Sequence, residues 1–107
     1  NDIKVEFHYE INADMMKRGG VYLLLNGQLG LGLVEAARMA QLRGLQIGKD
    51  IGIISYNDSY LSEIILGGLT TVSTDFEQMG YLAANMVLTH DLRKVKCDFK
   101  LTRRNTF

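Results

Sequence analysis

Two short apolar runs separated by a helical pattern constrain the fold more than any other feature of this sequence. The runs at 21–25 and 51–56 have the length of strands, and their consecutive apolar residues suit burial on both faces. Between them, apolar residues recur every three or four positions, as on one face of a helix, and Gly44 follows where such a helix would end. This order predicts a β-α-β unit with parallel strands and a right-handed crossover.

The patterns on either side extend the same α/β order. Residues 3–8 alternate between apolar and polar side chains, which is typical of a half-buried strand. Further on, the sequence predicts a short strand at 69–73, a helix at 75–88 that begins with capping-box spacing, and an alternating strand within 97–106. Strands that alternate with helices predict a layered α/β fold.

Length and composition limit the class of protein. The 107 residues fit one domain, and a hydrophobic content of 47% is too high for a disordered chain. No apolar run approaches the roughly 20 residues needed to span a bilayer, and no signal-like segment opens the chain. The single cysteine, Cys97, excludes an internal disulfide and is consistent with a reducing cytoplasm, where we expect it to be a small buried residue. Because the chain begins at Asn1 rather than Met, we expect it to be a fragment.

Basic residues are concentrated near the carboxyl terminus. Half of the twelve are Arg93, Lys94, Lys96, Lys100, Arg103 and Arg104. Such a cluster could attract phosphate, but no interleaved aromatic residues or recognition helix accompany it. We therefore expect a solvated loop and strand end rather than a nucleic-acid surface.

Polar residues stand where the predicted strands end. These are Asn26 after the first buried run, Asn57 and Asp58 after the second, and Thr74 at the start of the second helix. Ligands of open α/β sheets bind at the carboxyl ends of the strands, and amides and carboxylates suit a ligand with many hydroxyl groups. Phe76 could cover an apolar face of such a ligand. The same residue types are common helix caps and turn formers, and the local pattern favours neither interpretation.

Patterns for cofactors, metals and catalysis are weak. Gly27, Gly30 and Gly32 form G-x-x-G-x-G, whereas the dinucleotide fingerprint is G-x-G-x-x-G. His8 and His90 lie far apart and outside any metal-ligand spacing, and no serine lies in a nucleophile-elbow pattern. We therefore predict no cofactor, no metal site and no enzymatic activity.

Four segments resemble the effector-binding domain of the lac/galactose-repressor (LacI/GalR) family. They are V-Y-L-L-L-N at 21–26, G-L-Q-I-G-K-D-I-G-I-I-S-Y-N-D at 44–58, L-T-T-V-S-T-D-F-E-Q-M-G at 69–80 and L-T-R-R-N-T at 101–106. The resemblance implies a Rossmann-like, three-layer lobe of the periplasmic-binding-protein-like type on a parallel sheet, incomplete as a two-lobe domain. It places 1–73 mostly in the carboxyl-terminal lobe, the helix at 75–88 in the other lobe, and a return strand within 97–106. The S-Y-N-D and S-T-D-F variants also resemble sensor domains of this type fused to GntR-type regulators.

The same resemblance implies a ligand site. Asn26 matches an asparagine that bonds ligand hydroxyls, Asn57 and Asp58 stand where the family has an Asp-Asp pair, and Thr74 and Phe76 match crossover residues near the ligand. Asn57 replaces a carboxylate by an amide, which leaves room for a phosphorylated or acidic sugar because an amide does not repel an anion.

The resemblance also implies a homodimer formed through the first helix and the loop after the second buried strand. The interface residues would be Leu29, Leu31, Val34, Leu61, Ile64, Ile65 and Leu66. The alternative is that the apolar loop folds back onto the core of its own chain.

Together these features predict the ligand-sensing and dimerisation portion of a cytoplasmic transcription regulator. The effector would be a sugar or sugar derivative that changes DNA affinity through lobe closure, with DNA bound only by a domain absent from this chain and no contact with a membrane. The main alternative is a fragment of a periplasmic sugar-binding transport protein. A fragment of a nucleotide-dependent oxidoreductase and a purely structural assembly domain are the others.

Overall fold

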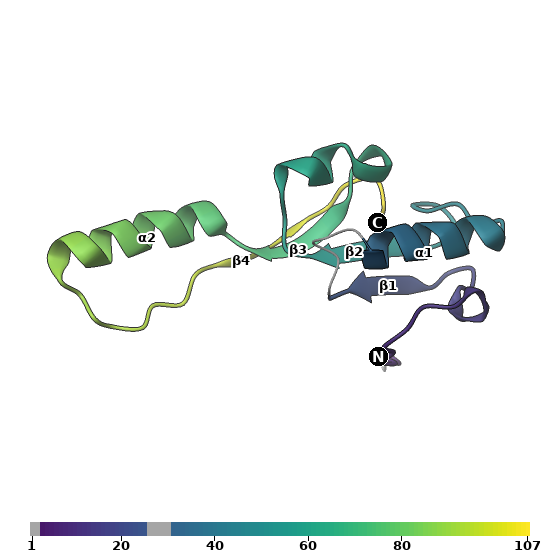
Figure 1. The fold of residues 1–107 in the computed structure, drawn as a ribbon, viewed down its shortest axis with the longest axis horizontal. Coiled ribbons are helices and arrows are strands. Elements are labelled where there is room, and N and C mark those ends of the chain that lie inside the picture. The colour runs from purple at the N-terminus through teal and green to yellow at the C-terminus, as the bar shows by residue number, and fades with distance from the viewer. Residues whose placement is uncertain (1–2, 26–30) are drawn as a thin grey trace.

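The computed structural model describes residues 3–25 and 31–107, which form a four-stranded sheet with helices (Figure 1). The strands are β1 (Val21–Leu24), β2 (Gly52–Tyr56), β3 (Thr70–Thr74) and β4 (Phe99–Thr102), in that spatial order. The α-helices are α1 (Leu31–Leu42) and α2 (Phe76–Thr89), and short 3-10 helices are η1 (Ala13–Met15), η3 (Tyr60–Glu63) and η4 (Ile65–Gly67). The predicted α/β class is confirmed.

The predicted β-α-β unit forms as β1, α1 and β2. β1 pairs in parallel with β2, and β2 pairs in parallel with β3. After α1 the backbone of Gly44 adopts φ +67°, a left-handed conformation that glycine takes without steric cost and that commonly ends a helix. The order of apolar runs and the single glycine therefore locate this unit correctly.

One face of the sheet carries the hydrophobic core. Leu33, Ala36 and Ala40 on α1 are buried, and their spacing of three and four residues places them on one side of the helix. The core consists of Met16, Leu24, Leu33, Ala36, Ala40, Ile51, Ile53 and Leu69. The two alanines let α1 approach the sheet closely, since their side chains end at Cβ.

The opposite face of the sheet is largely open. By the strand register, Val21, Leu23, Phe99 and Leu101 share this face, and they are 51–54% exposed. The prediction that β1 is buried on both faces is therefore wrong, whereas β2 is largely buried. In the described part of the chain, α1 is the α-helix that packs on the sheet, so the third layer of the predicted lobe is not among these residues.

The fourth strand differs in direction from the predicted parallel sheet. β4 pairs antiparallel with β3, with Thr74 opposite Phe99 and Thr71 opposite Thr102. The reason is visible in Figure 1: α2 leaves the end of β3, and residues 90–98 return the chain to that same end. A strand that begins where its neighbour ends must run antiparallel to it.

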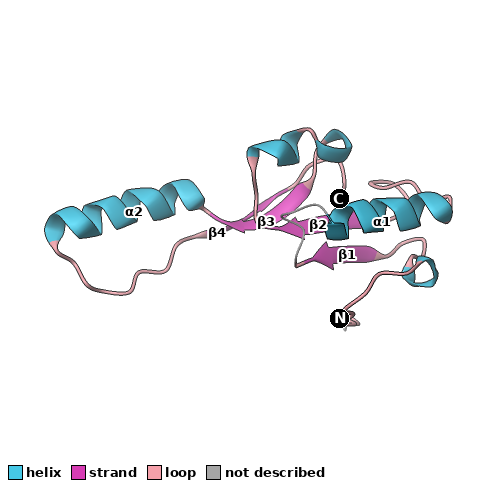
Figure 2. Cartoon of the chain, viewed as in Figure 1, coloured by secondary structure: helices cyan, strands magenta, loops and turns pink. Residues whose placement is uncertain are grey.

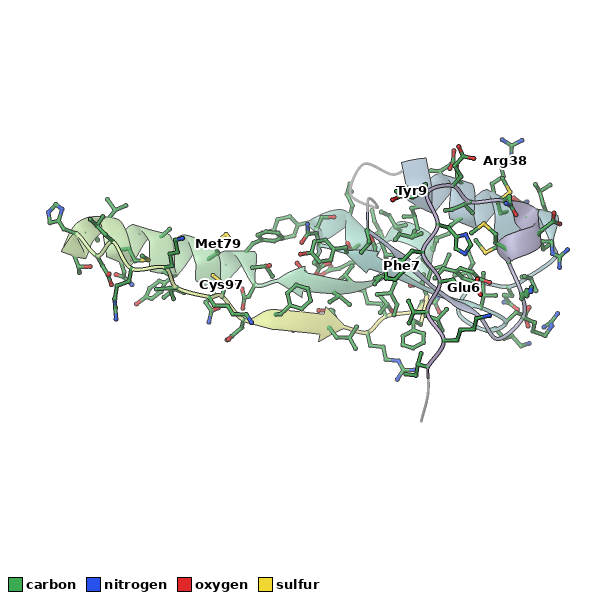
Figure 3. The ribbon with its side chains drawn as sticks, turned by 90° about the horizontal axis from the view of Figure 1, so that it is seen from below. Glu6, Phe7, Tyr9, Arg38, Met79 and Cys97 are labelled. Carbon is green, nitrogen blue, oxygen red and sulfur yellow. The ribbon has the colours of Figure 1, made fainter. Side chains whose placement is uncertain are left out.

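The strand predicted at 3–8 does not form. This segment has no regular structure, and Ile3, Val5 and Phe7 are exposed; Figure 3 shows Phe7 and Tyr9 on this irregular stretch. A strand needs a neighbour for its backbone hydrogen bonds, and these residues pair with no strand of the described sheet.

α2 projects away from the sheet (Figure 2). The Asp75 side chain accepts a hydrogen bond from the Gln78 N–H at 3.0 Å and caps the helix start, and His90 ends the helix with φ +53°. None of the α2 residues is buried. Among the described residues, no helix is long and apolar enough to cross a membrane.

Candidate functional site

The carboxyl ends of β2 and β3 bring four of the predicted ligand residues to one edge of the sheet. Tyr56 pairs with Val72, so the residues that follow each strand emerge side by side. Asn57 and Asp58 follow β2, and Thr74 ends β3 two residues before Phe76. The fifth predicted residue, Asn26, lies outside the described residues.

The chain turns sharply at Asn57. Its backbone has φ +71°, a left-handed conformation that is uncommon outside glycine but that asparagine tolerates better than most residues. The Asn57 N–H donates to the carbonyl oxygen of Val72 at 2.8 Å, which fixes the turn against β3. The turn directs the chain from the sheet edge into η3.

Asp58 forms a bidentate ion pair with Arg104. Nη1 of Arg104 donates to Oδ1 at 3.0 Å and Nη2 donates to Oδ2 at 3.1 Å. The two side chains are 31% and 16% exposed, respectively. The Arg104 guanidinium lowers the pKa of the Asp58 carboxyl, and its effect outweighs the partial burial that would raise this pKa.

Arg104 is itself held at the start of β3. Its Nη1 also donates to the carbonyl oxygen of Leu69 at 2.7 Å, and its backbone N–H donates to Thr70 Oγ1 at 2.8 Å. Two residues on, the Thr106 hydroxyl is buried; it accepts from the Thr70 N–H at 2.8 Å and donates to the carbonyl oxygen of Ile53 at 2.7 Å. The expectation of a solvated strand end is therefore wrong for Arg104.

The start of α2 forms the other side of the edge. The Gln78 side chain donates to Asp98 Oδ2 at 3.0 Å and accepts from the Asp98 N–H at 2.7 Å, which holds the first turn of α2 against the start of β4. A shallow pocket of about 340 Å³ lies here, lined by Asp75, Glu77, Gln78 and Tyr81. Phe76 is 47% exposed beside it.

Two aromatic rings lie at the sheet edge. The rings of Tyr56 and Phe99 have centroids 5.9 Å apart at an angle of 38°. Within residues 3–25 and 31–107, no group of His, Cys, Asp or Glu side chains is arranged to hold a metal ion. Cys97 is half-buried rather than fully buried as expected, on the segment that returns from α2 (Figure 3). The edge can therefore offer amide and carboxylate groups for hydrogen bonds next to aromatic surface.

Comparison with known protein families assigns this chain to one of them. Residues 12–96 match the periplasmic binding protein-like domain, which covers most of the chain. The chain belongs to this family. The match includes β1 to β3, α1 and α2, so the sheet edge with Asn57, Thr74 and Phe76 lies within the family domain.

The relatives of this periplasmic binding protein-like chain are transcription regulators of the LacI/GalR type. The regulator GalR of Streptococcus thermophilus is 31% identical over 98% of this chain and 34% of its own length. The lactose operon repressor of Escherichia coli K12 is 32% identical over 62% of this chain and 18% of its own length. The chain is therefore a fragment of a LacI/GalR-type effector-binding domain and spans about a third or less of the length of these relatives. These relatives give no support to the GntR-type resemblance.

A solved structure agrees with this assignment. The lac repressor dimer bound to operator and the anti-inducer ONPF has 27% identity and a TM-score of 0.58, over 80% of this chain and 27% of that chain. This kinship with repressors supports the prediction that the periplasmic binding protein-like chain is not an enzyme.

The residues predicted to form a dimer interface are placed as follows. Leu29 lies outside the described residues, and the Leu31 side chain is not described. Val34 on α1 is exposed, as are Leu61, Ile64 and, less so, Leu66 around η3 and η4. Ile65 instead packs against the core of its own chain. For this one residue, the alternative that the loop folds back onto the core therefore holds.

Arg104 is the site residue that sequence reasoning missed. The sequence pattern places it among exposed basic residues, because its partner, Asp58, is 46 positions earlier in the sequence. The available clue was the resemblance of L-T-R-R-N-T to the closing strand of the LacI/GalR family, which includes this arginine but gives no role for it.

Proposed function

We propose that this chain is the effector-sensing and dimerisation portion of a LacI/GalR-type transcription regulator. The effector is a sugar or sugar derivative, and DNA is bound by a domain that this chain does not contain. The observation that carries the proposal is the gathering of Asn57, Asp58, Thr74 and Phe76 at one sheet edge in a chain of this family.

The chemistry of the edge suits a ligand with several hydroxyl groups. The amide of Asn57 can donate and accept hydrogen bonds, and the half-exposed ring of Phe76 can cover an apolar sugar face. Since Asn57 is neutral, a phosphorylated or acidic sugar is admitted as well as a neutral one. Asn26 is a further ligand contact in this proposal.

Two adjacent segments support the proposed mechanism. The chain passes from β3 into α2 and returns from 90–98 into β4, so both connections leave the sheet at the edge that carries the candidate site. We assign residues 1–73 mostly to one lobe and 75–88 to the other, with a return strand within 97–106. An effector that binds the closed arrangement of the lobes more tightly shifts the population toward it and so changes the geometry presented to DNA.

The proposed homodimer uses the exposed apolar side chains of α1 and of η3 and η4. Val34, Leu61 and Ile64 are large, apolar and exposed, which favours burial in an interface. The lac repressor in the related structure is a dimer bound to operator. We place the regulator in the cytoplasm, where its DNA is.

The experiment measures effector and operator binding together in the whole protein. Calorimetric titrations with lactose, galactose and glucose 6-phosphate identify a ligand, and fluorescence anisotropy measures operator affinity with and without it. Asn57→Ala is expected to weaken ligand affinity by about tenfold, since a lost hydrogen bond costs about 1 kcal/mol or more. Asn85→Ala on the exposed face of α2 is the matched control and should leave affinity unchanged. Sugar binding that leaves operator affinity unchanged would contradict the proposal.

The alternative is a fragment of a periplasmic sugar-binding transport protein, since the matched family is described as a periplasmic binding protein-like domain. Fractionation of cells that express the whole protein separates the two. Recovery in the periplasm, with no operator binding, would favour transport.

A further inference from the structure

The Asp58 carboxylate is almost fully occupied by groups of its own chain. Oδ1 accepts from Arg104 Nη1 and from the Ser59 N–H, both at 3.0 Å, and Oδ2 accepts from Arg104 Nη2 at 3.1 Å. A carboxylate offers about four acceptor positions, and the Ser62 hydroxyl also lies near enough to donate to this carboxyl, so little acceptor capacity remains. Asp58 is therefore poorly suited to clasp several ligand hydroxyls.

We infer that Arg104 is a positioning residue of the effector site: it locks Asp58 in place and so sets the turn that presents the Asn57 amide to the ligand. This inference rests on the proposed function and gives Asn57 and Asp58 different roles. Asn57 recognises the ligand, and Asp58 serves as the anchor of the turn.

The geometry requires an arginine at this position. The guanidinium plane makes two parallel bonds to the carboxylate while the same Nη1 bonds the Leu69 carbonyl oxygen. A lysine ammonium is a point charge on a flexible stem and cannot reproduce this fork. The positive charge alone therefore does not replace Arg104.

Backbone and side-chain hydrogen bonds hold Arg104 firmly in place. Its backbone is bonded to Thr70, and Thr106 bridges β2 and β3 two residues later. The Asn57 N–H is bonded to Val72 on the same β3. Asn57 is thus bonded to β3 directly, and Asp58 is bonded to it through Arg104. A shift of the Arg104 side chain would therefore move Asp58 and with it Asn57.

The other groups that face the pair do not compensate for its loss. Ser59 and Ser62 donate hydrogen bonds and carry no charge, and the charge of Glu63 helps to raise the pKa of Arg104, which favours the charged guanidinium. No other cation acts on Asp58 among the described residues. The position of the carboxylate thus depends on Arg104.

The test compares Arg104→Lys with Arg93→Lys in the whole protein. Arg93 also makes a bidentate pair, with Asp91, but at an exposed site away from the sheet edge. Three quantities are measured: the pKa of Asp58 by carboxyl NMR, the HN–Hα coupling that reports the positive φ of Asn57, and the affinity for lactose, galactose and glucose 6-phosphate.

We expect Arg104→Lys to raise the pKa of Asp58 toward its ordinary value, to alter the Asn57 coupling, and to weaken ligand affinity on the order of tenfold. Arg93→Lys is expected to change none of these. A higher Asp58 pKa with an unchanged Asn57 coupling and unchanged affinity would overturn the inference, because Arg104 would then be only a structural partner.

Failure of the proposed function gives a different pattern. If the unsubstituted protein binds none of the three sugars, the proposed function is refuted for these effectors. The Asn57 coupling in Arg104→Lys still decides the inference: a changed coupling supports the positioning role, and an unchanged one overturns it. Asp58→Asn is the second variant, and it should alter the coupling as Arg104→Lys does, with Arg104 itself unchanged.

Discussion

The sheet body and the arm of this chain use equally good local sequence signals but differ in burial. The body comprises β1, β2, β3 and α1, and the arm comprises α2, residues 90–98 and β4. In the body, Ala36 and Ile53 are 0% exposed, whereas no residue of α2 is buried. Yet α2 is the longer helix, with Asp75 at its start and His90 in the left-handed conformation at its end.

The difference teaches that capping and apolar periodicity decide where a helix begins and ends, while tertiary packing decides what it adds to stability. A helix as short as α2 is marginal in water without packing. None of its residues is buried, and Tyr81, Val87 and Leu88 are exposed. In the LacI/GalR-type domain proposed above, α2 packs in the other lobe.

The largest expected effect on stability comes from a substitution in the core of the body. Ile53→Ala empties a fully buried position of β2 and should lower the free energy of unfolding by about 2–5 kcal/mol. In the 107-residue chain measured by itself, Val87→Ala removes an exposed side chain of α2 and should change the free energy of unfolding by less than about 0.5 kcal/mol. Urea denaturation followed by circular dichroism measures both. Similar losses in the two variants would show that the arm is packed in solution.

A matched pair of hydroxyl deletions sharpens the comparison. Thr106→Val leaves the buried Thr70 N–H without its acceptor and should cost about 1–3 kcal/mol. Thr89→Val removes an exposed hydroxyl that donates to the Asn85 carbonyl oxygen at 2.8 Å, and should cost less than about 0.5 kcal/mol. The same denaturation measurement applies. An equal cost for the two would indicate that the Thr106 bridge adds nothing beyond a local helix contact.

A smaller effect tests whether the arm unfolds on its own. Asp75→Ala removes the cap of α2 and should destabilise this helix by about 1 kcal/mol. Because α2 contributes little buried surface to the body, we expect faster amide hydrogen exchange in α2 and unchanged exchange in β2. Faster exchange in both elements would show that they unfold as one unit.

The body was predictable because its contacts follow local periodicity. The apolar spacing of α1 and the buried run of β2 depend only on neighbours in sequence, and Gly44 marked the helix end. The direction of β4 was not predictable, since alternation is the same for parallel and antiparallel strands. The failed strand at 3–8 has the same cause: a period of two says nothing about whether a partner strand exists.

The candidate site was predictable only in part. Residues that follow β2 and β3 meet at one edge because parallel neighbours end together, and this placed Asn57, Thr74 and Phe76. The pairing of Asp58 with Arg104 joins positions 46 residues apart, and no local pattern indicates it. The ligand roles of these residues remain predictions.

The smallest effect, and the sharpest contrast, comes from the two arginine–aspartate pairs as the pH falls. Both arginines lower the pKa of their partner: Arg93 lowers that of the half-buried Asp91 to about 2, and Arg104 lowers that of Asp58. Asp91 and Arg93 are two residues apart, so their pair can persist after unfolding, whereas the Asp58 pair needs the folded body.

A carboxyl whose pKa is lower in the folded state than in the unfolded state stabilises the folded state at pH values above the unfolded pKa of about 3.8. This contribution is lost as pH falls through the lowered pKa. We therefore expect stability to fall below about pH 4 and this fall to be weaker in Asp58→Asn but unchanged in Asp91→Asn. Denaturation midpoints between pH 2 and 6 check this, and a pH dependence reduced by Asp91→Asn instead would mean that the arm, not the body, carries the linkage.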